Sequence, residues 1–254
     1  STGNLTNLVV NFYVGLSTGA SVVIAQYYGA HNKGKIHQAV HTSYMLAIVS
    51  GIIMMLFGLF FSYQCLDAIG VPHDILNDAS LYMKLYFLGM IPGAIYNIGS
   101  GILRAVGDSK RPLYYLIICS IVNVVFDFVF VVILHKGIAG AAIATFIAQT
   151  VCAILVTLQL IFSKDVYQLT LSKIKFHLPV LKKIVKIGAP AGIQSTMYSI
   201  ANIVLQTHIN SFGTQTIASW SVYVKIDALF WMVMSAIGAA ITNFCRTKLW
   251  CSSL

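Results

Sequence analysis

Long apolar stretches separated by short polar connections run through the chain. A bilayer core about 30 Å thick requires about 20 helical residues to cross it. Seven stretches reach that length, namely Leu5–Tyr28, Thr42–Leu66, Ser80–Leu103, Leu113–Leu134, Ile138–Phe162, Ala189–Ser211 and Thr216–Phe244. This pattern predicts an all-α integral membrane protein, a polytopic bundle of transmembrane helices.

Composition supports the same prediction. Hydrophobic residues make up 58% of the 254 residues and charged residues 9%, whereas soluble domains contain roughly 25% charged residues. The net charge of +9 fits nucleic-acid binding in principle, but most Lys and Arg lie between the predicted helices, as membrane topology requires. We therefore expect the lipid bilayer, and no nucleic acid, as a partner.

The basic residues lie mainly in alternate connections. Connections 31–41, 104–112 and 163–188 carry most of them, while Asp67, Asp74 and Asp78 lie in an intervening one. Because basic loops remain in the cytoplasm, we expect these three connections to be cytoplasmic and the chain to be a multi-pass protein of the inner (cytoplasmic) membrane. The first visible helix would then begin outside, which predicts a further helix before it.

Segment 164–187 is the longest polar stretch. From Leu178 to Ile187, apolar residues recur at helical spacing, with Lys182, Lys183 and Lys186 on the opposite face. The segment fits either an interfacial helix on the inner leaflet or a plain cytoplasmic linker.

Glycines and prolines indicate helix contacts and bends. Gly15 and Gly19 share one helix face, as do Gly89 and Gly93, and this spacing lets helix backbones approach closely. Pro92, inside the third predicted helix, and Pro190, near the start of the sixth, each remove a backbone donor and predict a static bend.

Signatures of catalysis and of metal binding are absent from the sequence. Five Cys occur without a C-x-x-C pair or a Cys/His grouping at zinc spacing, and H-E-x-x-H is absent because the sequence contains no Glu. We expect no disulfide framework, no cofactor and no enzyme activity.

Several motifs resemble the multidrug and toxic compound extrusion (MATE) family. They are GLSTGASVVIAQYYGA (15–30), GILRAVGDSKRPL (101–113), NVVFD (123–127), GIAGAAIAT (137–145), IVKIGAPAGIQS (184–195) and VYVKIDALFW (222–231). The resemblance implies two lobes of six helices each, with the visible helices as the second to eighth of twelve. Residues 1–163 would form helices 2–6 of a nearly complete first lobe, 164–187 the linker, and 188–244 helices 7 and 8 of a truncated second lobe.

Residues 245–254 depart from that pattern. After Phe244 the sequence CRTKLWCSSL loses its apolar character, although the internal repeat predicts an ending similar to Gln26–Ala30. A one-base insertion before Cys245 accounts for this, because removing one base permits a reading as FVGQNYGA. We hypothesise such a frameshifted tail; a divergent tail is the alternative.

Asp127 is the residue that most directly suggests a mechanism. It lies inside an apolar helix, where an ionisable side chain is costly without a partner and marks a functional site by default. Asn123 lies one turn away on the same face, and Thr145 lies at a similar depth in the next helix. Their oxygen atoms suit sodium or a proton; alternatively, Asn123 holds a neutral Asp127 to fasten helices, and Thr145 bonds to its own backbone.

The resemblance implies sodium or proton coupling at Asn123, Asp127 and Thr145. It also places Tyr82 and Asn97 in the polar network of the first lobe. In the eighth helix, Lys225 and Asp227 either bind substrate in a central cavity or pair with other helices.

We therefore expect a cation-coupled antiporter that exports small amphipathic, cationic drugs or toxic compounds and is a monomer at full length. Two alternatives stay open, a lipid-linked precursor flippase of the same superfamily and a non-functional gene fragment.

Overall fold

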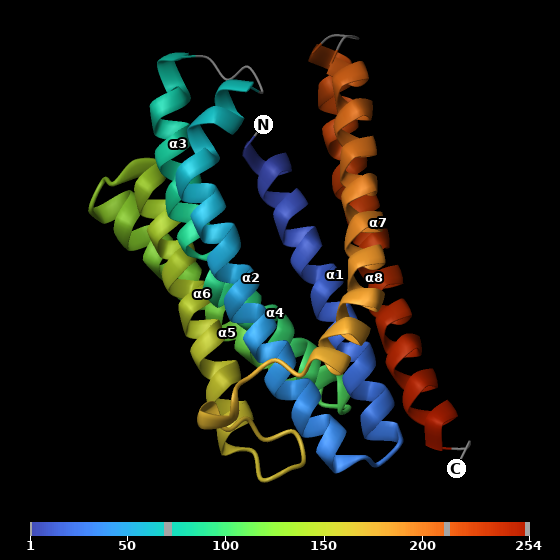
Figure 1. Cartoon of the computed structure of the whole chain (residues 1–254). Coiled ribbons are helices and arrows are strands. Elements are labelled where there is room, and N and C mark those ends of the chain that lie inside the picture. Colours follow the sequence, from blue (N-terminus) through green and yellow to red (C-terminus); the bar gives the residue numbers. More distant parts are fainter. Residues whose placement is uncertain (1, 69–72, 211–213, 252–254) are drawn as a thin grey trace.

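The computed structural model describes residues 2–68, 73–210 and 214–251, and the described chain is helical nearly throughout (Figure 1). The elements are α1 (Thr2–Gly29), α2 (Lys33–Ala68), α3 (His73–Leu88), α4 (Met90–Ala105), α5 (Lys110–Asp127), the π-helix η1 (Phe128–Ile133), α6 (Gly137–Phe162), the 3₁₀ turn η2 (Leu171–Lys173), α7 (Leu178–Asn210) and α8 (Thr214–Cys251). Each predicted span falls on helix wherever it is described, except for Gly89 between α3 and α4 and Leu134 just after η1.

The described helices include several that are long and apolar enough to cross a membrane. By length and composition these are the segments Lys33–Gln64, Lys110–Ile133 and Gly137–Phe162, and the bent pair formed by α3 and α4 makes a fourth. Side chains such as Ile121 and Val124 on α5 are 60% and 67% exposed. Exposed apolar faces of this kind are suited to contact with lipid.

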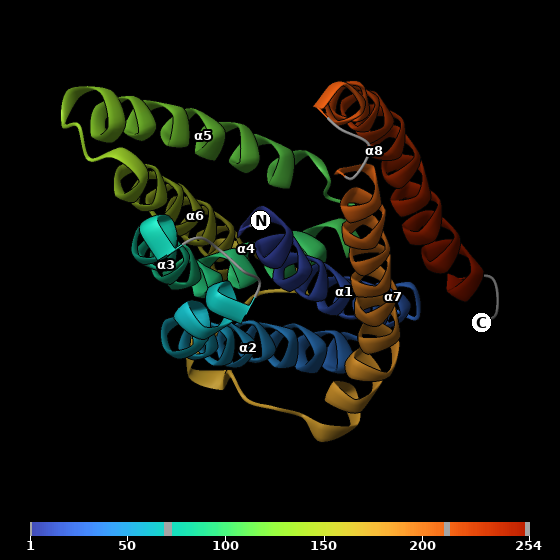
Figure 2. The same cartoon turned by 90° about the horizontal axis from the view of Figure 1, so that it is seen from above.

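Helix α1 occupies the middle of the bundle and separates two groups of helices. It packs against α2 and α4 on one side and against α7 and α8 on the other. Viewed from above, α5 lies at the outer edge beside α6, and α8 lies at the opposite edge (Figure 2). The largest fully buried side chains include Ile24, Ile36, Ile98, Ile102, Leu160 and Ile184, so the core lies where α1, α2, α4, α6 and α7 meet.

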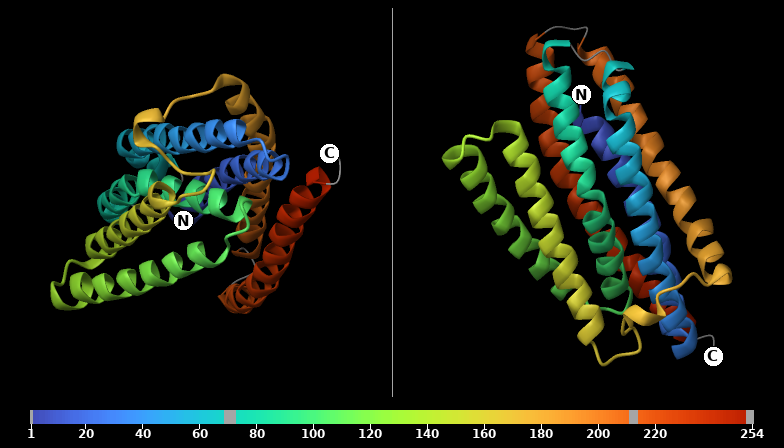
Figure 3. Two further views of the ribbon diagram at one scale, coloured as in Figure 1. Left: turned by 90° about the horizontal axis from the view of Figure 1, so that it is seen from below. Right: turned by 60° about the vertical axis from the view of Figure 1, so that its left-hand side comes forward.

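Connections 30–32, 106–109 and 163–177 lie at one end of the bundle, here called the basic end (Figures 1 and 3). The long connection from α6 to α7 is packed against α2. The buried His41 ring bonds the Thr170 backbone, with Nε2 accepting from its N–H at 3.0 Å, and the Thr42 hydroxyl accepts from the His177 N–H at 3.1 Å. This connection is therefore part of the packed structure.

The glycine spacing in α1 has the predicted packing role. A Cβ on Gly15 would collide with the backbone of Gly192, and a Cβ on Gly19 would come within 2.7 Å of Gly188 Cα. These glycines bring α1 and α7 into direct backbone contact, as small residues do between membrane helices.

The third predicted span is broken into two helices. α3 ends at Leu88, α4 begins at Met90, and their axes differ by 43°. Pro92 lacks the N–H that would bond the Leu88 carbonyl, so the helix bends in the turn before it. The bend predicted at Pro92 is confirmed, with Gly89 at the break, whereas α7 continues as one helix through Pro190.

Two features bear on the sequence-based expectations for the linker and the tail. Segment 178–187 forms no separate interfacial helix, because α7 runs without a break from Leu178 to Asn210, and Val180 and Ile184 are buried. The tail is helical as far as Cys251, since α8 extends that far, and residues 252–254 lie outside the described residues. The frameshift hypothesis concerns the nucleotide sequence and stays a prediction.

Candidate functional site

A cavity of about 280 Å³ lies among α4, α5 and α6. We call it the α5–α6 cavity. Asn97 of α4, Asn123 of α5, and Thr145 and Gln149 of α6 contribute its polar lining. Helices α5 and α6 follow one another in the chain and pack side by side, which brings Asn123 and Thr145 to one cavity. Similar depth predicts Asp127, rather than Asn123, beside Thr145.

Asp127 lies one turn beyond Asn123 on α5 and does not line that cavity. Its Oδ1 atom is buried, as is Nδ2 of Asn123, and neither atom has a hydrogen-bond partner among the described residues. A buried polar atom without a partner costs about 1–3 kcal/mol, and more when it is charged. Nδ2 of Asn123 therefore does not hold the Asp127 carboxyl group by a hydrogen bond in this structure.

The backbone changes its winding directly after Asp127. Residues Phe128–Ile133 form a π-helix, and the Leu134 N–H donates to the Val129 carbonyl at 2.9 Å. Wider π turns are rare and occur frequently at functional sites. The carboxylate therefore sits at the junction of an α-helical and a π-helical segment, a feature that hydrophobicity alone does not reveal.

Thr145 uses its hydroxyl hydrogen within its own helix, because Oγ1 donates to the Ala141 carbonyl at 3.0 Å. This is the bond expected for a helical threonine. A hydroxyl oxygen that donates one hydrogen bond still has lone pairs available. The bond is therefore compatible with Thr145 also serving as an oxygen ligand.

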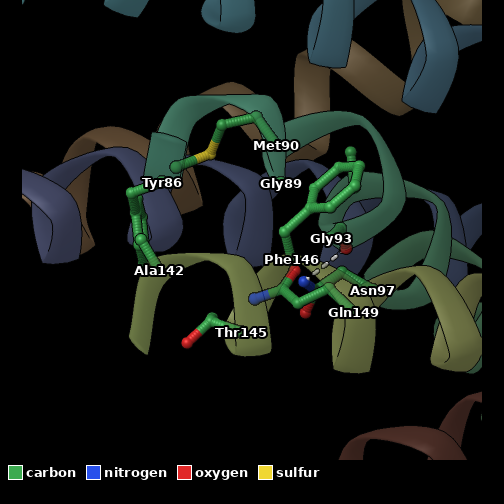
Figure 4. A pocket seen from close by; sticks show the side chains of 10 residues that line it. Tyr86, Gly89, Met90, Gly93, Asn97, Ala142, Thr145, Phe146 and Gln149 are labelled. Atoms are coloured by element: carbon green, nitrogen blue, oxygen red, sulfur yellow. Dashed lines mark hydrogen bonds between the residues drawn. The ribbon is translucent and has the colours of Figure 1, made fainter. Parts of the chain in front are cut away.

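Asn97 connects neighbouring helices and neighbouring cavities. The side-chain Nδ2 of Asn97 donates to the Gly93 carbonyl at 2.8 Å. The backbone carbonyl of Asn97 accepts from the Ser17 hydroxyl of α1 at 2.7 Å. A second, smaller cavity of about 70 Å³ shares Asn97, Thr145 and Gln149 with the first. In Figure 4 the side chains of Asn97 and Gln149 lie close together between α4 and α6.

Tyr82 lies one turn away from these cavities on α3. Its ring is 6.2 Å from that of Tyr86, centroid to centroid, and Tyr86 lines the smaller cavity. Tyr82 itself lines neither cavity in the part of the chain that is described. Its position is peripheral to the group formed by Asn97, Asn123 and Thr145.

A further cavity of about 650 Å³ lies between α1, α4 and α8, and we call it the α8 cavity. Helix α8 contributes Ser235, Ala236 and Gly238 to its wall. Lys225 is exposed and Asp227 is partly buried, and neither lines the α5–α6 cavity, its smaller neighbour or the α8 cavity. Both residues lie at least two helical turns before Ser235, and their substrate role stays a prediction.

Several residues of these cavities were not predicted from the sequence, among them Gln149, Ser17 and Arg104. Gln149 is one turn beyond Thr145, and a Cβ on Gly93 would collide with its side-chain oxygen, so Gly93 provides room for that amide. Ser17 and Arg104 line the α8 cavity. The four-residue spacing from Thr145 to Gln149 was an available signal, whereas Ser17 and Arg104 depend on how distant helices pack.

The chain is similar to a known protein family and to curated multidrug resistance proteins. The MatE family model matches residues 1–129. Among curated proteins, the chain is similar to the probable multidrug resistance protein YoeA of Bacillus subtilis, with 26% identity over 246 residues, covering 93% of the chain and 53% of the relative. It is also similar to the probable multidrug resistance protein NorM of Thermotoga maritima, with 24% identity over 234 residues, covering 91% of the chain and 50% of the relative.

Solved structures show the same fold. A MATE crystal structure in complex with MaD3S matches with a TM-score of 0.90 at 24% identity, covering 97% of this chain and 56% of that one. An outward-facing multidrug resistance MATE family transporter of the MOP superfamily matches with a TM-score of 0.84 at 23% identity, covering 97% and 54%. The chain spans about half the length of the curated relatives it matches. With the family model covering more than half of its residues, this multi-pass membrane chain belongs to the MATE family of multidrug transporters.

Proposed function

We propose that the chain forms part of a secondary transporter that exports small amphipathic compounds in exchange for sodium or protons. The observation that carries the proposal is the buried carboxylate oxygen of Asp127, which has no hydrogen-bond partner among the described residues and lies one turn from Asn123. A carboxylate in this position gains stability when it binds a cation or a proton.

In this proposal Asp127 and Asn123 bind the coupling ion, and Thr145 and Asn97 provide nearby oxygen atoms. Carboxylate, amide and hydroxyl oxygens suit a hard cation, whereas a transition metal favours imidazole or thiolate. Tyr82 contributes through its contact with Tyr86 at the edge of the smaller cavity.

The arrangement of the cavities supports coupling between ion and substrate. Asn97 lines the α5–α6 cavity and also the larger α8 cavity. Binding of the ion near Asn123 therefore acts on a helix, α4, that also forms the wall of the cavity proposed for the exported compound. A ligand that binds one arrangement of these helices better shifts the population toward it.

The basic end supports an orientation for the chain in the cytoplasmic membrane. Lys33 and Lys35, Lys110 and Arg111, and Lys164 and Lys173 all lie in or next to its connections. Because basic connections remain inside, we propose that this end faces the cytoplasm. Compounds then enter the α8 cavity from the cytoplasmic side and leave at the opposite end.

An efflux assay tests the proposal. The gene, expressed from its full native locus in a drug-sensitive strain, is expected to lower the accumulation of a fluorescent substrate, and Asp127→Asn is expected to abolish that effect because the amide cannot carry the charge. The matched control is Asp165→Asn, since Asp165 is exposed in the connection from α6 to α7. Unchanged efflux in Asp127→Asn at normal expression would contradict the coupling role.

A further inference from the structure

The α8 cavity contains a positive charge and no negative one in its described lining. Arg104, at the end of α4, lines it together with the hydroxyl-bearing Ser17, Thr18, Ser21 and Ser235. These polar groups come from α1, α4 and α8, three elements that are far apart in sequence. The wall also includes Val14 and Val22, so an apolar surface lies beside the polar groups.

Arg104 has no carboxylate partner in the described part of the chain. The nearest acidic residue in the sequence, Asp108, pairs instead with Arg111 at 3.2 Å. A guanidinium stays protonated under all physiological conditions, and Arg104 is partly buried. A partly buried cation without a counter-ion in the protein attracts an anion from outside it.

The volume and the chemistry of the cavity together suit one class of ligand. About 650 Å³ lies within the usual range for small-molecule sites, roughly 300–1,000 Å³. An arginine fork recognises carboxylate and phosphate groups in a planar, two-bond geometry, and serine hydroxyls can donate to the same oxygens. Asp227, the acidic residue of α8, does not line the cavity.

We propose, on the basis of the export function above, that the α8 cavity binds amphipathic compounds through an anionic group held by Arg104. The anionic group is a carboxylate or a phosphate, and the apolar part of the compound lies against α1 and α8. The exported compounds then include amphipathic acids and zwitterions. This differs from the expectation, based on sequence alone, of simple cations.

A matched pair of probes tests the inference by direct binding. The protein, produced from its full native locus and held in phosphatidylcholine nanodiscs, is titrated with 1-pyrenebutyric acid and with its uncharged methyl ester. The acid is expected to bind at least about tenfold more tightly, which corresponds to about 1.4 kcal/mol. Arg104→Gln is expected to remove this difference while leaving ester binding unchanged, and Arg104→Lys to retain part of it.

Arg111→Gln is the matched control, because Arg111 pairs with Asp108 outside the cavity. Equal affinities for acid and ester in the unchanged protein would overturn the inference. An equal loss of both probes in Arg104→Gln would also overturn it, since that result assigns Arg104 a purely structural role. Size-exclusion profiles of all variants separate misfolding from lost binding.

Two further measurements complete the test. One identifies the source of the anion, and the other distinguishes a failure of this inference from a failure of the proposed function. If phosphatidylglycerol displaces the acid in an Arg104-dependent manner, the anion site is supported with an inner-leaflet lipid as its source; if it does not, the exported compound is the source. Asp127→Asn is expected to keep the difference between acid and ester, because Asp127 lies outside this cavity. Lost efflux with retained Arg104-dependent binding would then count against the coupling mechanism alone.

Discussion

Individual side chains in this protein satisfy some hydrogen bonds locally and leave others open. Thr145 and Thr150, both on α6, donate to carbonyls one turn back, at 3.0 and 2.8 Å. Thr145 lines the α5–α6 cavity, whereas Thr150 lies outside it. The two threonines therefore make the same local bond, but only Thr145 borders the cavity. Comparing them separates a candidate ion ligand from a structural threonine.

Replacing Thr145 with Val distinguishes sodium from proton coupling. Val is close in shape but lacks the hydroxyl oxygen, so a sodium-coupled transporter is expected to need about tenfold more sodium for half-maximal efflux, a cost of about 1.4 kcal/mol. A proton-coupled transporter is expected to keep its pH dependence, because the proton resides on Asp127. Sodium and pH titrations of efflux measure both.

Thr150→Val is the control for that measurement. It removes the corresponding bond on the same helix outside the cavity, so its sodium dependence should equal that of the unchanged protein. Equal shifts in both variants would show that the hydroxyls act on helix stability and would remove Thr145 from the proposed ion site.

Sequence reasoning reached part of the candidate site at this scale. Asn123 was predicted because it shares a helix face with Asp127, and Thr145 because its depth is similar to that of Asp127. Asn123 and Thr145 line one cavity, and Asp127 does not. The orphaned carboxylate oxygen of Asp127 was not predictable, since it depends on the side-chain arrangement of α5. Arg104 was grouped with the basic connection, because sequence alone does not show that α8 packs across it.

The length of each apolar stretch determines where the helices of this bundle form, and glycines determine how closely α1 and α7 pack. The seven predicted spans fall on helices where they are described, the third on two of them. In lipid, a single segment of about 20 apolar residues can satisfy its backbone hydrogen bonds internally only as a helix. The break at Gly89, the π-helix after Asp127 and the early start of α7 were not predicted in detail. Each depends on packing against other helices, which the lengths of the apolar stretches do not record.

The contact between α1 and α7 gives a prediction about stability. In Gly19→Ala the added Cβ comes within 2.7 Å of Gly188 Cα, so the helices must separate. Overpacking of this kind costs about 1–3 kcal/mol, which for a chain of this size corresponds to a fall in melting temperature of at least about 2 °C. Thermal unfolding in detergent, followed by size-exclusion fluorescence, measures the change.

Gly34→Ala is the matched control, because the nearest atom to a Cβ at Gly34 is Asn32 Oδ1 at 3.9 Å. This variant should unfold at the temperature of the unchanged protein. Equal melting temperatures for Gly19→Ala and Gly34→Ala would contradict the close backbone packing of α1 and α7.

At the scale of the whole molecule, charge is distributed unevenly between the two ends. At the basic end, each of the three connections contains or adjoins Lys or Arg residues. At the other end, the turn between η1 and α6 carries Lys136 alone. The sequence predicted this division correctly because the count of basic residues in each connection needs no knowledge of packing.

Cysteine labelling tests the orientation that follows. In a background with all five native cysteines replaced, Lys136→Cys is expected to react with a membrane-impermeant maleimide in intact cells. Ser172→Cys, exposed in η2 at the basic end, is expected to react only after the cells are permeabilised. The opposite pattern would reverse the proposed orientation and with it the direction of transport.

Asn97 borders three polar cavities in the described part of the molecule, the α5–α6 cavity, its small neighbour and the α8 cavity. Because the cavities share this side chain, binding in one of them can change the affinity for a ligand in the others. Whatever factor the ion applies to the affinity for an exported compound, the compound must apply to the affinity for the ion. In the proposed exchange, the ion weakens the binding of the compound. A compound that binds well should therefore lower the ion's affinity by the same factor, and this can be measured in detergent without an ion gradient.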